Sequence, residues 1–385
     1  PFGRGRRVSP FTLGTMRALD SPAQMAGVLE AALAAGINHV ETAPAYGPAE
    51  QLLGEALHRL GQLDTARREA LVITSKLLPC PSLEQGRAEL KALLARLGLT
   101  RLDNLAIHGL NLPDHLAWAL EGDGRELLRW ALGEGLVGQV GFSSHGSTSL
   151  IEQALASGVF QFCSLHLHLF DQERLPLARA ALGQGIGVMA ISPADKGGRL
   201  YDPPPELVAD CAPFHPLELA YRFLLDQGIS TLTLGAAQPQ DLAWAAALNQ
   251  GPGGTFSDGS AEAGDGWLSP SHQAALNHLE AAGKQRLGSS QCGQCRQCLP
   301  CPNAVPIPAL LRLRNLAIGH GMAPFATERY SLIGRAGHWW EEVDASACQG
   351  CGDCLPRCPL DLPIPDLLAE THQRLAAPAR RRLWG

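Results

Sequence analysis

The sequence has few aromatic residues, a small net charge and no long apolar run. Aromatic residues make up 5% of the chain, and the formal net charge is −6, with no basic stretch of the kind that nucleic acid requires. No apolar segment reaches the roughly 20 residues that a membrane-spanning helix needs. The basic first residues lead into no apolar stretch, so no signal peptide is predicted. We therefore expect a cytoplasmic protein that binds neither nucleic acid nor membrane.

The hydrophobic content of 45% is that of a globular protein, and 385 residues exceed what one hydrophobic core usually supports. Two domains are therefore expected. The 11 cysteines are spread unevenly: Cys80, Cys163 and Cys211 are scattered, while the other eight lie between Cys292 and Cys358. Such clustering indicates metal ligation in a reducing compartment and not a disulfide framework.

Up to about residue 250, short apolar runs alternate with amphipathic segments of helical length. Helix signals accompany them, as at Ser21–Pro22, which precede a helical pattern that ends at Gly36. Eight such units predict an α/β fold, a (β/α)8 TIM barrel, whereas a doubly wound sheet lacks its GxGxxG motif here. The predicted strands lie within residues 11–16, 37–43, 70–77, 102–109, 139–145, 160–170, 186–193 and 230–236.

The Gly- and Ser-rich segment 251–266 is interpreted as a flexible loop, followed by a further helix that packs outside the barrel. We place the domain boundary near residue 286. The barrel domain then comprises residues 1–285. Residues 286–385 form a second domain, with a basic tail at Arg380, Arg381 and Arg382.

Two cysteine motifs dominate the second domain. Each has three cysteines at CxxCxxC spacing and a fourth that precedes a proline, and the second motif matches the bacterial ferredoxin pattern CxxCxxCxxxCP in full. The segments CPNAVPIPALL and CPLDLPIPDLL mark an internal repeat. In such pairs the fourth cysteine reaches the neighbouring cluster. The predicted ligand sets for two [4Fe–4S] clusters are Cys292, Cys295, Cys298 and Cys358, and Cys348, Cys351, Cys354 and Cys301.

Paired CxxC groups also suit structural zinc, but zinc needs only two close pairs and leaves the other cysteines redundant. We therefore favour iron–sulfur clusters. The long interval between the motifs has helical segments, which predicts a small, mainly helical two-cluster ferredoxin-like domain.

Four residues with reactive side chains lie at or just after the ends of the predicted second, third and fourth strands. Glu41 ends the second strand, Tyr46 follows it in a loop, Lys76 ends the third strand and His108 ends the fourth. In a barrel these ends meet at one mouth. The segment GINHVETAPAYGPAEQLLGEAL and the strands behind it resemble the aldo-keto reductase signature, over residues 1 to about 285. With the cysteine-rich C-terminus, the chain resembles the aldo-keto reductases that are fused to a 4Fe–4S ferredoxin-type domain.

The resemblance implies an NAD(P)H-dependent oxidoreductase that acts on an aldehyde or ketone. A phenol can donate the proton when hydride leaves charge on the carbonyl oxygen, and a neighbouring ammonium eases that proton's release. Tyr46 is the expected acid, Lys76 the ammonium, Glu41 the group that holds Lys76, and His108 the group that orients the carbonyl. Only four lysines and four tyrosines occur in the chain. Taken singly, these residues have structural explanations; their order on successive strand ends favours catalysis.

Three departures from the family pattern stand out. The family usually has Asp where this chain has Glu41. The sixth predicted strand offers Ser164 and Leu165 in place of an Asn–Gln pair that often binds the nicotinamide amide. Ile191 stands where an aromatic residue commonly stacks on the nicotinamide.

Cofactor binding is expected after the seventh and eighth strands, where barrels bind phosphate. The cofactor is predicted to be NADP(H), with NAD as an alternative because the eighth loop has no arginine for a 2′-phosphate. The expected contacts are Ser143, Ser144, Ser192, Lys196, Gly197, Gly198, Gly235, Ala236, Gln238 and Asp241.

Nicotinamide passes two electrons as hydride whereas each cluster passes one, and no dedicated flavin motif is visible to split the pair. Three hypotheses follow. The barrel is a carbonyl reductase with structural or docking clusters; or a flavin or redox-active substrate exchanges single electrons with the clusters and an external ferredoxin; or the protein is a nucleotide-binding redox or oxygen sensor without catalysis. The substrate and the oligomeric state are not readable from the sequence.

Overall fold

The computed structural model describes residues 2–194, 199–250 and 266–378. The chain forms two compact units, one of Pro1–Pro193 and Tyr221–Trp267, and the other of Ala194–Ala220 and Leu268–Gly385. Within the described ranges, no helix is both long and apolar enough to cross a membrane.

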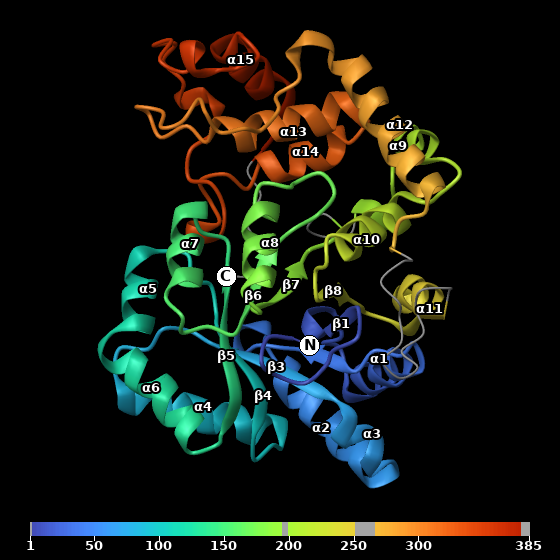
Figure 1. The fold of residues 1–385 in the computed structure, drawn as a ribbon, viewed down its shortest axis with the longest axis vertical. Coiled ribbons are helices and arrows are strands. Elements are labelled where there is room, and N and C mark those ends of the chain that lie inside the picture. The colour runs from blue at the N-terminus through green and yellow to red at the C-terminus, as the bar shows by residue number, and fades with distance from the viewer. Residues whose placement is uncertain (1, 195–198, 251–265, 379–385) are drawn as a thin grey trace. The chain divides into compact units, whose positions relative to one another are not determined.

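The first unit is a closed barrel of eight parallel strands in sequence order (Figure 1). All eight strands lie where the sequence predicts them, which confirms the (β/α)8 barrel. They are β1 (Phe11–Gly14), β2 (His39–Glu41), β3 (Val72–Leu77), β4 (Leu102–Ile107), β5 (Val137–Ser144), β6 (Phe162–His166), β7 (Gly187–Ile191) and β8 (Thr231–Gly235).

Helices cover the outside of the strands, and successive helices contact one another (Figure 1). The helix α1 begins as predicted, because the Ser21 side chain accepts a hydrogen bond from the Gln24 N–H and Pro22 occupies the first turn. The helices of this unit are α1 (Pro22–Ala34), α2 (Ala49–Leu63), α3 (Thr65–Ala70), α4 (Leu83–Leu97), α5 (Pro113–Leu120), α6 (Gly122–Gly133), α7 (Thr148–Ala156), α8 (Leu175–Gly183), α11 (Ala243–Gln250) and the second half of α10 (Pro216–Asp226).

The amino ends of the strands are closed by the N-terminal segment. Phe2 and Val8 form an apolar cluster with strand residues that include Val72 and Phe162. Beside this cluster, the buried His39 ring joins two threonines: Nδ1 lies 2.7 Å from Thr12 Oγ1, and Nε2 lies 2.7 Å from Thr74 Oγ1. The amino ends of the strands therefore close over a packed core, and an active site is expected at the carboxyl ends.

The second unit is helical, with short 3-10 turns near its cysteines. Its helices are α9 (Pro205–Cys211), the first half of α10, α12 (Pro270–Leu287), α13 (Ile307–Gly319), α14 (Ala323–Tyr330) and α15 (Ile364–Leu375). The fold thus combines a (β/α)8 barrel with an additional helical C-terminal region.

The helix α12 belongs to the second unit, and its expected packing outside the barrel stays a prediction. It contacts α9 and α13 within the second unit, where it buries Leu279 and Leu287. Arg286 also forms a bidentate ion pair with Asp210 of α9. The C-terminal segment of this compact unit begins at Leu268. The boundary of the functional domains near residue 286 stays a prediction.

Candidate active site

The four predicted catalytic residues come from adjacent elements at the carboxyl end of the barrel. Glu41 is the last residue of β2, and the 3-10 turn Pro44–Tyr46 follows it directly. Lys76 lies in β3, which pairs with β2 on one side and β4 on the other. His108 follows β4, where its backbone N–H donates to Leu77 O at 2.8 Å. Strand order alone therefore brings these side chains to one mouth.

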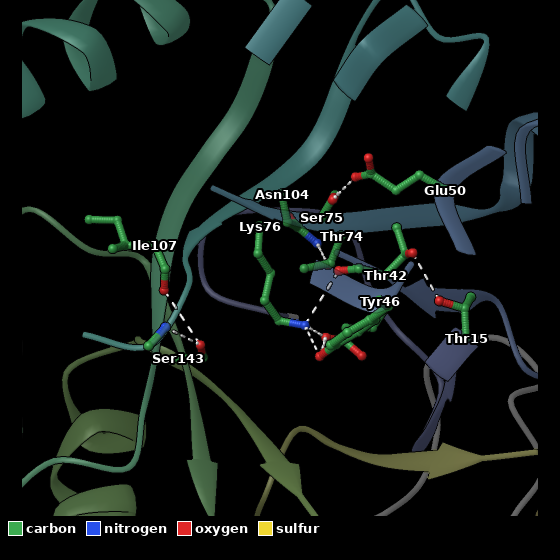
Figure 2. A network of polar contacts seen from close by, with 12 residues as sticks. Thr15, Thr42, Tyr46, Glu50, Thr74, Ser75, Lys76, Asn104, Ile107 and Ser143 are labelled. Atoms are coloured by element: carbon green, nitrogen blue, oxygen red, sulfur yellow. Dashed lines mark hydrogen bonds and ion pairs between the residues drawn. The ribbon is translucent and has the colours of Figure 1, made fainter. Parts of the chain in front are cut away.

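Three of the side chains form one polar cluster. Lys76 Nζ donates to Tyr46 Oη at 2.7 Å, and the two residues face each other in the site (Figure 2). Lys76 also forms an ion pair with Glu41 Oε1. Tyr46 Oη in turn donates to the same carboxylate oxygen at 3.2 Å. Because Lys76 and Glu41 are only 2% and 3% exposed, solvent screens these contacts weakly.

His108 completes the group from the next strand. Its ring is nearly perpendicular to the Tyr46 ring, with the ring centroids 5.8 Å apart and an interplanar angle of 88°. The side chain is 7% exposed. An imidazole and a phenol in this arrangement can contact the same substrate oxygen from two sides.

Burial lowers the pKa of Lys76 well below its usual value. A buried ammonium loses hydration that only a nearby anion or dipole can replace, and here Glu41 and the Thr42 carbonyl oxygen face it. The Glu41 carboxylate opposes this lowering, because an anion in contact favours the charged form of the lysine. A protonated Lys76 would act on the phenol in a site of low dielectric, where charge affects proton transfer most strongly.

A second buried carboxylate supports β3 from outside the barrel. Glu50 of α2 accepts a hydrogen bond from the Ser75 hydroxyl at 2.6 Å and pairs with Arg96 of α4 at 2.7 Å. Burial raises the pKa of Glu50, and the bonds to Ser75 and Arg96 oppose that rise. Sequence reasoning did not identify Glu50; its only signal is an acidic residue at an inward position of α2.

The predicted nicotinamide contacts Ser143 and Ser144 lie at the end of β5, but their hydroxyls bond to the loop that follows β4. Gly109 N–H donates to Ser143 Oγ at 3.0 Å (Figure 2 shows Ser143 beside Ile107). Ser144 Oγ donates to Leu110 O at 2.6 Å. Both serines are buried. In this structure they fix the loop that carries His108.

The predicted phosphate loops are described in part. Lys196, Gly197 and Gly198 lie outside the described residues. Ser192, directly after β7, has a left-handed backbone with φ of 57°.

After β8, the Asp241 carboxylate accepts hydrogen bonds from the N–H groups of Ala237 and Gln238, at 2.8 and 3.2 Å. Asp241 therefore shapes this loop. Ala236, the residue directly after β8, is fully buried.

Sequence reasoning missed one cation here. A Cβ atom on Gly235 would lie 3.2 Å from Arg17 Cδ and 3.3 Å from Arg17 Nε, so the exposed Arg17 side chain crosses the end of β8. Arg17 belongs to the turn after β1, which pairs with β8 only when the barrel closes. The eighth loop, which lacks its own arginine, thus receives one from the first.

A third group of polar residues lies after β6. His166, His168 and Asp171 each place one ligand atom within 4.8 Å of the others, as a metal site would. However, Phe170 N–H donates to His168 Nδ1 at 3.2 Å, which leaves the ring proton on Nε2, the nitrogen that faces Asp171 at 4.0 Å. A metal-bound histidine instead donates its outer ring N–H to an acceptor. The arrangement fits a His–Asp contact better than a cation site.

In the second unit, the fourth cysteine of each motif lies beside the other motif. One cavity is lined by Cys301 together with Cys348, Cys351 and Cys354. Burial raises the pKa of the Cys292 thiol, and the neighbouring thiols of Cys295 and Cys358 raise it further. Cys301 thus lies with the second motif and Cys358 near the first, while the two ligand sets stay a prediction.

The backbone repeats between the two cysteine loops. Equivalent positions have positive φ, which turns successive N–H groups toward the thiols, as where Gln294 N–H donates to Cys292 Sγ at 3.4 Å. The matched pairs are Gln294 with Gly350, Arg296 with Gly352, and Ala304 with Asp361. Such an array of thiols and inward N–H groups fits an anionic cluster.

Comparisons with known proteins agree with the barrel. The family model for the aldo/keto reductase family matches residues 10–203. The 6-dehydroglucose reductase of Novosphingobium aromaticivorans is 32% identical over 222 residues, which are 52% of this chain and 69% of that protein.

Two solved structures extend the comparison. A putative aldo-keto reductase from Pseudomonas aeruginosa is 25% identical, with a TM-score of 0.51 over 64% of this chain and 93% of its own. An aldo-keto reductase from Bacillus halodurans shares the fold at 18% identity, with a TM-score of 0.56 over 72% of this chain and 94% of its own. With half of its length matched by the family model, this chain belongs to the aldo/keto reductase family and is an oxidoreductase.

Proposed function

We propose that the barrel reduces an aldehyde or ketone with NADPH, with Tyr46 as the proton donor. The observation that carries this proposal is the 2.7 Å hydrogen bond between Lys76 Nζ and Tyr46 Oη at the barrel mouth. An ammonium at this distance stabilises the phenolate that remains after proton donation. Burial of Lys76 strengthens the effect, because no water screens the charge.

Each side chain then has a defined task. Tyr46 Oη donates its proton to the substrate oxygen, while Lys76 stabilises the phenolate that forms. His108, whose ring stands across that of Tyr46, orients the carbonyl oxygen toward the acid. When bound, the nicotinamide cofactor supplies the hydride for the carbonyl carbon.

The cofactor contacts are proposed for the loops around β7 and β8. Ser192, Lys196, Gly197 and Gly198 would contact the phosphates, Gly235, Ala236, Gln238 and Asp241 the adenosine end, and Ser143 and Ser144 the nicotinamide side. Arg17 joins this set, because its guanidinium crosses the end of β8 where the eighth loop begins. Arg17 and Lys196 together favour NADPH over NADH.

Tyr46→Phe tests the reductase proposal under anaerobic conditions. We expect carbonyl-dependent NADPH oxidation to fall by about 10²–10⁴-fold, the usual contribution of a general acid, while NADPH binding measured by fluorescence is kept. Retained turnover in Tyr46→Phe would contradict the assignment. Turnover absent from the wild-type protein with every carbonyl tested, despite nucleotide binding, would overturn the function itself.

A carbohydrate-type carbonyl is the substrate class that we propose to test first. The relative from Novosphingobium aromaticivorans is named for a dehydrogenated glucose. The mouth carries imidazoles at the ends of three strands, His108, His145 and His166, and these can bond to several hydroxyl groups. A keto-sugar should therefore be reduced with a lower KM than a simple aliphatic ketone of the same size. Equal KM values for both would argue against this class.

We further propose that the C-terminal unit binds two [4Fe–4S] clusters through the eight motif cysteines. Support comes from the two sets of four thiols and from the repeated left-handed loop positions. Cys295 and Cys351 are exposed, so each cluster would have an edge near the surface for an electron-transfer partner such as a ferredoxin.

The cluster proposal predicts about eight irons per chain after anaerobic purification, with broad brown absorbance. Two tetrahedral zinc sites could use the same thiols. Zinc bound in place of iron would therefore disprove the clusters while leaving the ligand sets intact.

A further inference from the structure

Glu41 makes a contact that its expected task does not require. A carboxylate that only holds Lys76 needs to reach the ammonium, yet Glu41 Oε1 also accepts the hydroxyl proton of Tyr46 at 3.2 Å. Tyr46 has a single hydroxyl hydrogen. In the resting site that hydrogen is directed to Glu41 and not to the position of a substrate oxygen.

The extra methylene of Glu explains how one carboxylate reaches both groups. Glu41 ends β2, and the second oxygen, Oε2, lies near Gly14 at the end of β1, where a Cβ would stand 3.7 Å from it. That distance is an ordinary van der Waals contact, so the end of β1 borders the Glu41 carboxylate without crowding it. An aspartate is about 1.5 Å shorter, so it would move away from Tyr46 Oη.

We propose that Glu41 holds the Tyr46 proton in the resting site, and that a substrate oxygen must replace Glu41 as acceptor before Tyr46 can act as an acid. The kinetic part of this proposal rests on the proposed reductase function; the hydrogen bond itself does not. During reduction, hydride adds to the carbonyl carbon and the Tyr46 O–H bond breaks. The carbonyl oxygen takes the proton, and the phenolate later regains one from solvent.

Glu41 and a substrate carbonyl oxygen compete unequally for the hydrogen bond from Tyr46. A carboxylate is a stronger acceptor than a neutral carbonyl oxygen, so the resting bond opposes substrate binding. Among the described residues, the titratable groups that contact Tyr46 include Glu41 from β2, Lys76 from β3 and His108 after β4. Lys76 favours proton release from Tyr46, whereas Glu41 favours proton retention. A glutamate at this position therefore makes the acid weaker than an aspartate would.

The test uses the full cluster-loaded chain and measures the Tyr46 phenolate by its ultraviolet absorbance. Each variant is compared with the same variant carrying Tyr46→Phe, so that the clusters and the other tyrosines cancel. We expect the phenolate to appear about one pH unit lower in Glu41→Asp and in Glu41→Gln than in wild type. Lys76→Met should raise the pH at which the phenolate appears, and this variant serves as the control for the direction of the shift.

The kinetic arm follows from the same competition. In Glu41→Asp, kcat/KM for a carbonyl should rise by roughly tenfold, the effect of one charge-assisted hydrogen bond, and KM should fall more than kcat rises. A phenolate midpoint equal to that of wild type in both Glu41 variants would overturn the proposal. Were wild type inactive toward carbonyls, the spectroscopic shift would still stand, so the two proposals fail separately.

Discussion

Individual side chains decide both the chemistry and part of the stability of this barrel. Lys76 is the clearest case, because its ammonium is buried, its pKa is lowered by that burial, and it contacts both Tyr46 and Glu41. In the proposed reaction, this buried group lies beside the phenol that loses its proton. Such placement is typical of catalytic sites, where desolvated charges act most strongly.

Lys76→Met should leave the fold intact and reduce carbonyl turnover. Methionine fills a similar volume, and it removes the buried charge that stabilises the phenolate. We expect kcat to fall by about 10²-fold or more at neutral pH, because the phenolate left after proton donation is no longer stabilised. The pH at which turnover is lost through ionisation of Tyr46 should move upward. A pH–rate profile measures this, and a profile parallel to that of wild type would contradict the role.

His39 should make the stability of the barrel depend on pH. Burial lowers its pKa to about 3 from 6.5, so the unfolded chain takes up a proton below pH 6.5 that the folded chain refuses. Stability should therefore fall as the pH drops from 6.5 toward 3, by a few kcal/mol in order of magnitude.

Thermal unfolding of wild type and His39→Gln over this pH range measures the effect, since glutamine does not titrate. The wild-type curve should steepen below pH 6.5 relative to the variant. His58→Gln, at an exposed position of α2, is the matched control and should change nothing. Identical pH slopes for wild type and His39→Gln would refute the prediction.

At the scale of elements, the close packing of α2 on α4 supports the active-site strand. Gly54 of α2 faces the Arg96 backbone so closely that a Cβ would overlap with the Arg96 carbonyl oxygen. Arg96 in turn holds Glu50, which bonds to Ser75 next to Lys76. Two helices and one strand thus form a continuous connection to Lys76.

Gly54→Ala should destabilise the barrel by about 1–3 kcal/mol, because the added methyl group forces the two helices apart. Gly27→Ala in α1 is the control, since no atom lies within 4 Å of its Cβ position. Alanine there should stabilise the helix by about 0.5–1 kcal/mol. The melting temperatures of the two variants should therefore move in opposite directions. A lowered melting temperature for both would show that the space around the added methyl group does not decide the effect.

At the scale of the whole molecule, the proposed crossing of cysteine ligands would join the two loops of the C-terminal unit. Besides burial, the neighbouring thiols of Cys348, Cys351 and Cys301 contribute to the raised pKa of Cys354, and Cys354 contributes to that of Cys298. The two groups of thiols are therefore adjacent. In the proposed ligation, each cluster takes three thiols from one loop and the fourth from the other. Residues separated by more than fifty positions would then fold around the metal together.

Paired substitutions distinguish crossed from uncrossed ligation. Cys301→Ser with Cys348→Ser removes two ligands of one proposed cluster, and about four irons should remain. Cys301→Ser with Cys292→Ser damages both clusters, and fewer than about four intact-cluster irons should remain. Iron content and electron paramagnetic resonance measure the outcome; the reverse order would establish that each loop binds its own cluster.

The sequence alone determined the barrel and the identities of the candidate catalytic residues. Eight alternating strand and helix patterns are local signals, and consecutive parallel strands can close in few ways, so the strand ends and their residues were predictable. The spacing of the cysteines is equally local. Glu41, Tyr46, Lys76 and His108 could therefore be named before any coordinates were known.

Only the tertiary structure decided the contacts between segments distant in the chain. Barrel closure brings Arg17 of the first loop to Gly235 of the eighth, and helix packing places Glu50 behind Ser75. The pairing of α12 with α9 depends on the ion pair of Arg286 with Asp210. The bond from Tyr46 to Glu41 depends on the length of the Glu41 side chain and on the turn that places Tyr46 above β2. Such contacts are fixed by three-dimensional packing, which periodicity and spacing do not encode.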